Sequence, residues 1–542
     1  MYLVIYIKIL TILPVHQRFF SNTLWVILAC LLLLPALLIN LGLMTFIDDE
    51  AIRALVALEM KWSGNFITPT LHGEYYYNKP PLFNWILLVF FELSGRVDEF
   101  TARIPTVLAL LGYAASVFFV FRRHYGSGQA VLAAFMLITC GRVLFWDAML
   151  ALIDCTFSWV IFGMFMTVYH FFEKGKWTVL FLGAYLLGAI GFLLKGLPAV
   201  VFLGLTLSGY FLFRGALSRL LSWQHILGIL VFTGVVGTYY SFYLQFNALD
   251  TVFQTLFSES SKRTVVNYGL GRTVMHVFTF PFEMVYHFFP WSLMAIFVLD
   301  REVWSRIRRH PFTACLAVIF LSNIWVYWIS PEVYPRYLLM FVPLVFGIFL
   351  DLRTWHSERG TIHTRIFLGI LVAMAASFFI AAFLPFFLGR LQIVPNWPLK
   401  SIFLGIASGL AFWKMTRNVS VWGVPMAIIV LLLFRIGFNW FVLPDRNAHD
   451  FGKLCRETSL LAGKAYRDER MLVYKKTDMQ PTNSFYLTIA RGSVIPRDLV
   501  GSDTSALYII DPNDYPDIGV RKVSEIKVRH GALTYDIGPL SE

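Results

Sequence analysis

Charged side chains occur at a few places along a strongly apolar chain, and their types suggest one kind of chemistry. The stretch DDEAIRALVALEM begins with Asp48, Asp49 and Glu50, and Lys79 follows it in the motif NKPP. A carboxylate at a membrane interface can act as a general base towards an alcohol or an amine. Lysine and arginine side chains can neutralise a phosphate, and the attraction is much stronger outside bulk water. This combination favours transfer of a group from a lipid-phosphate carrier, with the phosphate as the leaving group.

Three further ionisable residues interrupt apolar segments. Asp147 and Asp154 stand seven residues apart in FWDAMLALIDC, a spacing that places both on one stripe if the segment is helical. Asp154 lies within an apolar segment, where solvation does not explain a charge. Lys195 interrupts another apolar stretch in FLLKGLPAV, although a turn between two spans would also account for it. A solvated helix end similarly accounts for the acidic run at 48–50, so the argument rests on the common side of these residues.

The composition predicts a polytopic helical membrane protein. Of 542 residues, 58% are hydrophobic and 14% are charged, whereas a soluble protein carries about 25% charged residues. The net charge of +12 does not indicate nucleic-acid binding, because lysine and arginine cluster in short loops between apolar segments. The five cysteines form no CxxC pair, so we expect neither a disulfide framework nor a cysteine metal site.

The distribution of basic residues predicts the orientation of the spans. Lys8 and Arg18 precede the first clear span, residues 24–46, so the loop after it is expected outside. If residues 82–94 lie at the outer interface and do not cross, every inward turn is basic, and about thirteen spans result. The other spans are then expected at residues 104–121, 129–146, 155–172, 177–194, 197–213, 224–244, 285–299, 313–329, 337–350, 366–388, 398–413 and 420–441. This topology places on the outer side Asp49, Glu50, Lys79, Asp147, Lys195, Glu259, Arg263 and Arg336.

The chain divides into two predicted domains. Residues 1–443 form the transmembrane domain, and its outer loop at 47–103 holds the candidate site. Residues 444–542 are less apolar and are expected to form a soluble α/β domain on the outer side. A helix is expected near residues 450–469 of this domain. Strands are predicted at MLVYKK (471–476), SFYLTI (484–489), ALYIID (506–511) and KVSEIKV (522–528).

The first outer loop resembles that of the GT-C glycosyltransferases of the aminoarabinose transferase and protein O-mannosyltransferase group. The shared residues, in order, are Asp49, Glu50, Glu59, Met60, Ser63, Gly64, Pro69, Gly73, Tyr75, Lys79, Pro80 and Pro81. Weaker similarity continues in LLKGLPAV, FFPWSL and SPEVYPRYLLMFVPL. After the Asp-Glu pair the family commonly has Ala-Arg-Tyr, whereas this chain has Ala51, Ile52 and Arg53, so its arginine is displaced by one position.

The resemblance implies a GT-C fold and a sugar donor linked to polyprenyl phosphate, of the undecaprenyl phosphate type. It assigns the catalytic carboxylate to Asp49 and the phosphate-binding lysine to Lys79. It assigns a second functional acid to Asp147 or Asp154. Transfer on the periplasmic face of a bacterial inner membrane is expected, with no cofactor or metal required. His72 and His276, on the outer side, are expected to be structural.

The hypothetical mechanism is a single displacement with inversion. Asp49 takes the proton from the acceptor, while cations stabilise the departing phosphate. The side chains expected to bind substrate or phosphate are Glu50, Tyr77, Lys79, Lys195, Arg263, Arg336 and Tyr337.

The acceptor stays open between a lipid A-like lipid, a glycan and a protein, so protein O-mannosylation is an alternative. A transporter or lipid flippase is a further alternative, although the chain lacks the paired inverted repeats typical of many transporters. A non-catalytic membrane scaffold is also possible, because a fold does not imply a function. The expected partners are the bilayer, the lipid-linked sugar and the acceptor, and not nucleic acid.

Overall fold

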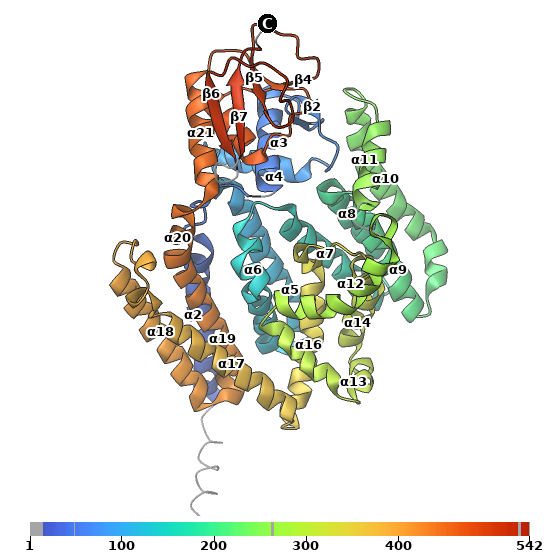
Figure 1. Ribbon diagram of the computed structural model, residues 1–542. Helices are drawn as coiled ribbons and strands as arrows, with labels where there is room; N and C mark the ends of the chain where they lie inside the picture. The colour runs from blue at the N-terminus through green and yellow to red at the C-terminus, as the bar shows by residue number, and fades with distance from the viewer. Residues whose placement is uncertain (1–14, 48, 262–264, 529–532, 541–542) are drawn as a thin grey trace, which may run out of the picture.

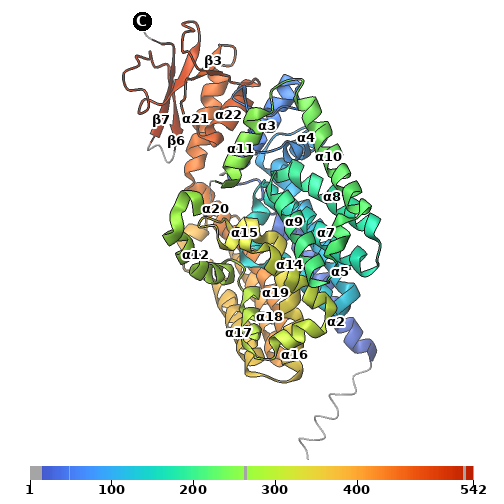
Figure 2. The same ribbon diagram turned by 90° about the vertical axis from the view of Figure 1, so that its right-hand side faces the viewer.

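The computed structural model describes residues 15–47, 49–261, 265–528 and 533–540, so Asp48 and the predicted site residue Arg263 lie outside the described residues. The described chain forms a bundle of long helices with a small sheet domain at one end, which both views show (Figure 1, Figure 2). This arrangement confirms the predicted fold class, a multi-pass helical membrane protein with a C-terminal domain that contains a sheet.

Most long helices of the bundle lie in predicted apolar segments, whereas α3 (Asp49–Ser63) and α11 (Asp250–Ser261) lie in predicted outer loops. In chain order they are α2 (Val15–Leu38), α3 (Asp49–Ser63), α4 (Leu82–Ser94), α5 (Glu99–Thr139), α6 (Gly141–Phe145), α7 (Ile153–Glu173), α8 (Trp177–Lys195), α9 (Pro198–Phe213), α10 (Trp223–Tyr243), α11 (Asp250–Ser261), α12 (Val265–His287), α13 (Val303–Arg309), α14 (Pro311–Asn323), α15 (Trp325–Trp328), α16 (Val342–Glu358), α17 (Ile362–Ala381), α18 (Trp397–Arg417), α19 (Val419–Gly437) and α20 (Leu443–Ala448). Short 3-10 or π segments join them: η1 (Asp147–Met149), η2 (Leu217–Leu221), η3 (Trp291–Leu299), η4 (Pro335–Phe341), η5 (Leu384–Phe386), η6 (Gly389–Leu391) and η7 (Phe438–Val442).

Eight of the described helical stretches are long and apolar enough to cross a membrane. They cover Glu99–Thr139, Ile153–Glu173, Trp177–Lys195, Trp223–Tyr243, Pro311–Trp328, Pro335–Glu358, Ile362–Phe386 and Val419–Ala448. Shorter apolar helices cover Thr23–Leu38, Leu82–Ser94 and Pro198–Phe213. The count of about thirteen spans therefore stays a prediction.

Three predicted spans differ in form from the helices observed. The spans expected at 104–121 and 129–146 fall within or next to α5, whose two parts meet at Gly126. Gly126 has φ 81° and ψ 166°, a conformation that glycine adopts readily and that breaks the helix. The span expected at 285–299 is not one helix, because α12 ends at His287 and a 3-10 segment begins after Pro290, which lacks a backbone N–H.

The C-terminal domain combines two helices with a mixed sheet. Its helices are α21 (Phe451–Ala465) and α22 (Pro481–Arg491), and its strands are β3 (Met471–Tyr474), β4 (Arg497–Asp498), β5 (Leu507–Ile510), β6 (Ser524–Val528) and β7 (Leu533–Gly538). The strand order is β4-β3-β5-β7-β6, in which β3 pairs parallel with β4 and β5, and β7 pairs antiparallel with β5 and β6.

The strand predicted at 484–489 is wrong, because these residues lie in α22. Pro481 occupies the first turn of this helix, and Gly492 ends it in the left-handed conformation with φ 74°. The apolar run is buried because α22 packs between α21 and α3, so a core helix produced the pattern of a buried strand.

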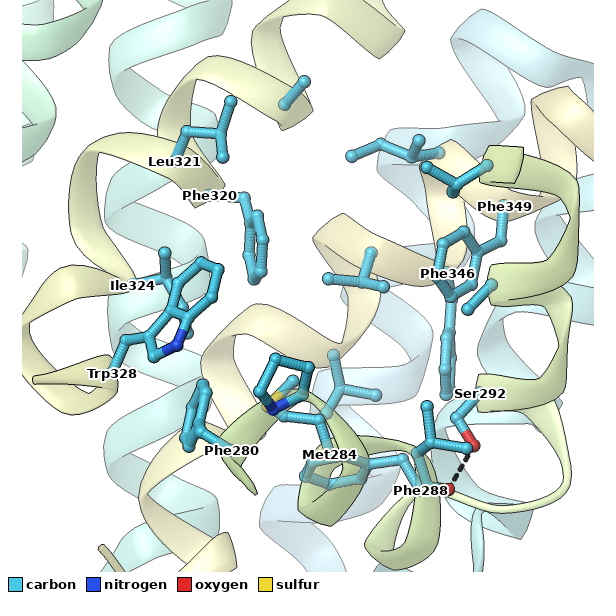
Figure 3. A pocket seen from close by; sticks show the side chains of 18 of the residues that line it. Phe280, Met284, Phe288, Ser292, Phe320, Leu321, Ile324, Trp328, Phe346 and Phe349 are labelled. Atoms are coloured by element: carbon cyan, nitrogen blue, oxygen red, sulfur yellow. Dashed lines mark hydrogen bonds between the residues drawn. The ribbon is translucent and has the colours of Figure 1, made fainter. Parts of the chain in front are cut away.

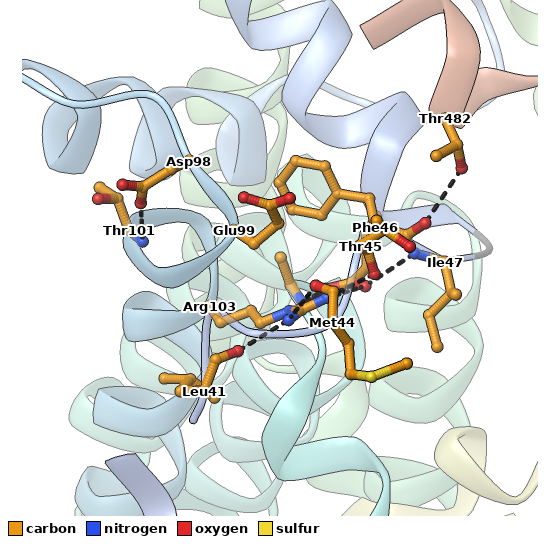
Figure 4. A network of polar contacts seen from close by, with 12 residues as sticks. Leu41, Met44, Thr45, Phe46, Ile47, Asp98, Glu99, Thr101, Arg103 and Thr482 are labelled. Carbon is orange, nitrogen blue, oxygen red and sulfur yellow. Dashed lines mark hydrogen bonds and ion pairs between the residues drawn. The ribbon is translucent and has the colours of Figure 1, made fainter. Parts of the chain in front are cut away.

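The C-terminal domain docks on the segment that leads into α3 (Figure 4). Thr482 donates to the carbonyl of Phe46 over 3.1 Å, and the amide of Phe46 donates to the Tyr486 hydroxyl over 3.3 Å. Tyr486 in turn donates to Glu99, which also pairs with Arg456 at 3.2 Å. Helix α22 therefore holds Phe46, three residues before Asp49.

A buried ion pair within the bundle also fixes the segment that leads into α3. Arg103 of α5 donates to both carboxylate oxygens of Glu50 over 2.9 and 3.0 Å. Arg103 also donates to the carbonyls of Leu41, Met44 and Thr45 over 2.7–3.1 Å (Figure 4). Glu50 is fully buried and accepts two backbone N–H groups as well, from Ile47 and Ala151. Its four hydrogen bonds join the first loop, α5 and the segment before α7.

Replacing Arg103 with methionine should destabilise the protein strongly. The change leaves the Glu50 carboxylate buried without its cation, which costs about 3–5 kcal/mol in comparable buried pairs. Thermal unfolding in detergent, followed by circular dichroism, would measure the loss. The double variant R103M/E50Q should be more stable than R103M alone, and equal melting of R103M and the parent protein would contradict the assignment.

Candidate active site

Asp49 begins α3 at the edge of the bundle. An acidic residue in the first turn is favoured there by the partial positive charge of the helix N-terminus. The side chain is 48% exposed, and one carboxylate oxygen lies 3.1 Å from Nη2 of Arg336. Asp49 is therefore an accessible carboxylate next to a buried cation.

Arg336 joins Asp49 to a second carboxylate. Its guanidinium lies in η4, is 3% exposed and places Nε 3.5 Å from Asp154 at the start of α7. Asp154 also accepts a hydrogen bond from Lys195, the last residue of α8. Packing of α7, α8 and η4 thus brings together three residues that are distant in the sequence.

Tyr337 provides an aromatic wall to this cluster. The Lys195 ammonium lies 3.8 Å from the centre of the Tyr337 ring, and Arg336 lies 4.6 Å from the centre of the Tyr334 ring. Both distances allow cation–π attraction, which is strengthened by burial. The rings hold the two cations in place without neutralising them.

Lys79 follows a short hairpin, β1 (Thr70–Leu71) and β2 (Glu74–Tyr75), and faces the same cluster. Burial lowers the pKa of Lys79 to about 8, with further lowering by the positive charges of Arg53 and Lys195. Asp49 and Glu259 act in the opposite direction. Among the described residues, Lys79 forms no hydrogen bond or ion pair.

Arg53 was not expected at the site, yet the structure places it there. It stands one helical turn after Asp49 on α3, so both residues share a face. Its Nη2 donates to the Tyr76 hydroxyl over 2.5 Å, and the ring of Tyr76 lies 5.1 Å from the guanidinium. Nη1 is buried without a hydrogen-bond partner among the described residues. The displaced arginine of the loop motif was the sequence signal for this residue.

Asp147 and Asp154 do not share one helical stripe, because residues 150–152 between them are not helical. Asp147 lies in η1 and is 5% exposed, with Arg142 at 3.1 Å. Burial raises the pKa of Asp147 to about 7, although the charge of Arg142 partly opposes the shift. Asp147 is the carboxyl of the cluster that changes its charge near neutral pH.

The remaining predicted residues lie in different surroundings. Tyr77 accepts a hydrogen bond from the Asn247 amide over 2.9 Å. Both carboxylate oxygens of Glu50 accept hydrogen bonds from Arg103 and from the amides of Ile47 and Ala151. Glu50 therefore holds the loop and does not meet a ligand. A buried carboxylate would also repel a phosphate.

Two buried side chains support the hairpin before Lys79. Glu59 accepts hydrogen bonds from Thr70 and from the amides of His72 and Gly73 over 2.6–3.1 Å. The ring of His72 lies 3.1 Å from the Ser484 hydroxyl and 3.2 Å from the Ile495 carbonyl, both in the C-terminal domain. Burial lowers the pKa of His72 to about 4, so the ring is neutral at pH 7. No metal-binding group of three acidic, cysteine or histidine side chains occurs among the described residues.

The Lys79 ammonium should titrate near pH 8, and its pKa should rise towards the ordinary value when Arg53 is replaced by methionine. Removing a neighbouring positive charge favours the protonated form of a lysine. Reductive methylation with carbon-13 and NMR titration would measure the midpoint, with assignment by K79R. The control R456M removes an arginine of the C-terminal domain and should leave the midpoint unchanged. An unchanged midpoint in R53M would mean that Arg53 does not act on Lys79.

Part of the chain matches a known family model, and two relatives are similar over more than half of it. Residues 78–241 match the family model described as dolichyl-phosphate-mannose-protein mannosyltransferase. An uncharacterized protein of Aquifex aeolicus (strain VF5) is 25% identical over 387 residues, which cover 67% of this chain and 74% of the relative. A second uncharacterized protein of the same organism is 24% identical over 317 residues, 56% of this chain and 68% of the relative.

Two crystal structures share the fold. ArnT from Cupriavidus metallidurans bound to undecaprenyl phosphate superposes with a TM-score of 0.68 and 18% identity, over 95% of this chain and 98% of that chain. ArnT in the apo state gives a TM-score of 0.65 with the same identity and coverage. The chain therefore shares the fold of ArnT over nearly its whole length, and residues 78–241 are similar to the mannosyltransferase family.

Proposed function

We propose that the chain transfers a sugar from a polyprenyl-phosphate donor to an acceptor at the periplasmic face of a bacterial inner membrane. The observation that carries the proposal is one accessible carboxylate, Asp49, within electrostatic range of the buried cation Lys79, which has no ion pair among the described residues. The ArnT structure bound to undecaprenyl phosphate supports a lipid phosphate as the carrier. The basic inward turns support an outward site.

The donor phosphate is held by Lys79 and Arg53, with Arg336 at its side. Lys79 has no partner among the described residues, and Arg53 has a buried nitrogen without one, so both suit an incoming anion. The low dielectric of a partly buried site strengthens their attraction for phosphate. Lys195 stabilises the cluster through Asp154 and lies further from the ligand.

The reaction is a single displacement. The acceptor oxygen or nitrogen attacks the anomeric carbon, and the bond from that carbon to the phosphate oxygen breaks with its electron pair. Asp49 accepts the acceptor's proton, and the cations stabilise the charge on the departing phosphate. Attack opposite the leaving group inverts the anomeric centre. Asp154 positions Arg336, and Asp147 supplies the second acid near the sugar.

The prenyl tail of the donor lies in an apolar cavity of about 330 Å³ (Figure 3). Aromatic side chains line it, including Phe280, Trp328, Phe346 and Phe349, and Ser292 turns its hydroxyl to the Val285 carbonyl. Helix α16, which forms one wall, continues directly from the η4 segment that carries Arg336. A chain whose phosphate meets Arg336 can therefore enter this cavity.

The acceptor class separates two versions of the proposal. A lipid A-like or glycan acceptor is favoured by the shared fold with ArnT, which extends over nearly the whole chain. Protein O-mannosylation is favoured by the family model that matches residues 78–241. Mass spectrometry of lipids, glycans and proteins from cells with and without the chain would distinguish them.

Replacing Asp49 with asparagine should lower kcat by about a hundredfold or more, the usual range for a general base. The donor KM should change little, because asparagine keeps the size of the side chain. Product formation by the purified protein with a polyprenyl-phosphate sugar would be measured by mass spectrometry. D250N changes another exposed aspartate that begins a helix, α11, and should keep full activity.

Full activity in D49N would refute the assignment of the base. Uptake of the lipid-linked sugar into vesicles without any transfer product, in the parent protein, would instead favour the transporter alternative.

Replacing Ala317 with tryptophan should fill part of the apolar cavity and weaken binding of long donors only. Each CH₂ group kept out of the cavity costs about 0.8 kcal/mol, so two of them raise the KM about tenfold or more. A donor with two isoprene units, which does not reach the cavity, should keep its KM. The control A373W places the same ring on an exposed face of α17. Equal effects on long and short donors would place the tail elsewhere.

A further inference from the structure

A second cavity, with polar and charged side chains at its rim, lies at the end of the bundle opposite the sheet domain. It has a volume of about 350 Å³, within the range of ligand sites, and lies between the first part of α5 and the last turns of α7. His124 stacks on Phe312 with ring centres 4.0 Å apart, which fixes the cavity beside the α13–α14 turn. Figure 1 shows α13 at the lower end of the bundle, away from the strands.

The cavity is far from the candidate active site. Asp154 begins α7, whereas His170 lies in its last turn. Sixteen residues of helix separate them, which corresponds to about 24 Å at 1.5 Å per residue. A ligand in this cavity therefore does not touch the cluster around Asp49.

Positive charge lies at the rim of this cavity. Arg123 and His170 line it, and Arg123, Lys174 and Lys176 are close enough to His170 to act on it electrostatically. Arg123, Lys174 and Lys176 are exposed and have no carboxylate partner among the described residues. The nearby carboxylate of Glu173 is occupied by Arg214 and Tyr210.

Two other arginines at this end of the bundle are neutralised. Arg306 pairs with Asp351 at 2.7 Å, and Arg359 pairs with Glu302 at 2.9 Å. These two arginines therefore add no uncompensated positive charge near the cavity.

The wall below the rim is apolar. It consists of Phe119 and Val120 from α5 and of Phe162 and Met166 from α7, both of which are candidate spans. Gly163 opens the wall, since a Cβ there would meet only Leu187, at 3.8 Å. Positive charge at the rim next to an apolar wall suits an amphipathic anion.

We propose that this cavity binds an anionic phospholipid of the inner leaflet, with its phosphate at Arg123 and His170 and an acyl chain along α5 and α7. Arginine binds phosphate through two parallel hydrogen bonds, and basic pockets between helices on the cytoplasmic side suit anionic headgroups. The site is independent of the proposed transfer reaction and stabilises the inward half of the bundle.

The test measures thermal unfolding of the full chain in vesicles of phosphatidylcholine with and without phosphatidylglycerol. Phosphatidylglycerol should raise the melting temperature, and R123A/H170A should lose at least half of that rise. The control R308A/R309A removes two exposed arginines of α13 and should keep the rise. Loss of the same size in both variants, or no rise in the parent protein, would overturn the proposal.

Two measurements keep the proposal testable if R123A/H170A does not fold. Labelling of T167C, which places a thiol on the cavity lining, should be slowed by phosphatidylglycerol and not by phosphatidylcholine. Glycerol 3-phosphate added in detergent should give no stabilisation. Stabilisation by this soluble phosphate, or labelling that phosphatidylglycerol does not slow, would exclude a lipid as the ligand.

Discussion

The buried carboxylate of Glu50 is the interaction on which the site geometry depends. It joins the backbone before α3, the guanidinium of Arg103 on α5 and the amide of Ala151. These partners belong to three parts of the chain that each carry or adjoin a residue of the cluster. Because a buried charge is stable only when its hydrogen bonds are complete, this node allows little variation in the position of Asp49.

The cluster of ionisable side chains around Asp49 contains more positive than negative charge near its exposed side. Asp154 is enclosed by Lys195 and Arg336, and Asp49 shares Arg336 from the open side. Lys79 and Arg53 add two cations that repel each other, and Asp49 and Glu259 offset part of that repulsion at Lys79. Such an arrangement is suited to a phosphate that gains charge as it leaves, and its cations add to burial in lowering the pKa of Lys79.

The C-terminal domain contributes to the site through the backbone it holds. Helix α22 binds the residues before Asp49, and Arg497 binds the hairpin before Lys79 through the His72 carbonyl and a 3.0 Å pair with Glu74. Both ends of the first outer loop are therefore anchored to the same domain. Its packing couples the position of the Asp49 carboxylate to that of Lys79.

The sequence by itself determined the class of the protein and the loop that carries its site. Apolar length and basic turns indicate a multi-pass membrane protein, because each depends only on residues near one another in the chain. The spacing of the loop motif similarly identified Asp49 and Lys79 as candidates. The periodicity of apolar residues did not identify α22 as a helix, because a helix buried on all sides has the same pattern as a buried strand.

Only the tertiary structure decided which charges meet. Arg336 contacts Asp49 although 287 positions of sequence separate them. Arg53 stands one position away from the arginine of the family motif, yet it is close enough to Lys79 to act on it electrostatically. The tertiary structure also gives two adjacent residues different environments: Glu50 is enclosed by its partners, whereas Asp49 is half exposed. The reason is physical: a side chain's exposure and partners depend on how distant helices pack, and neither composition nor spacing contains that information.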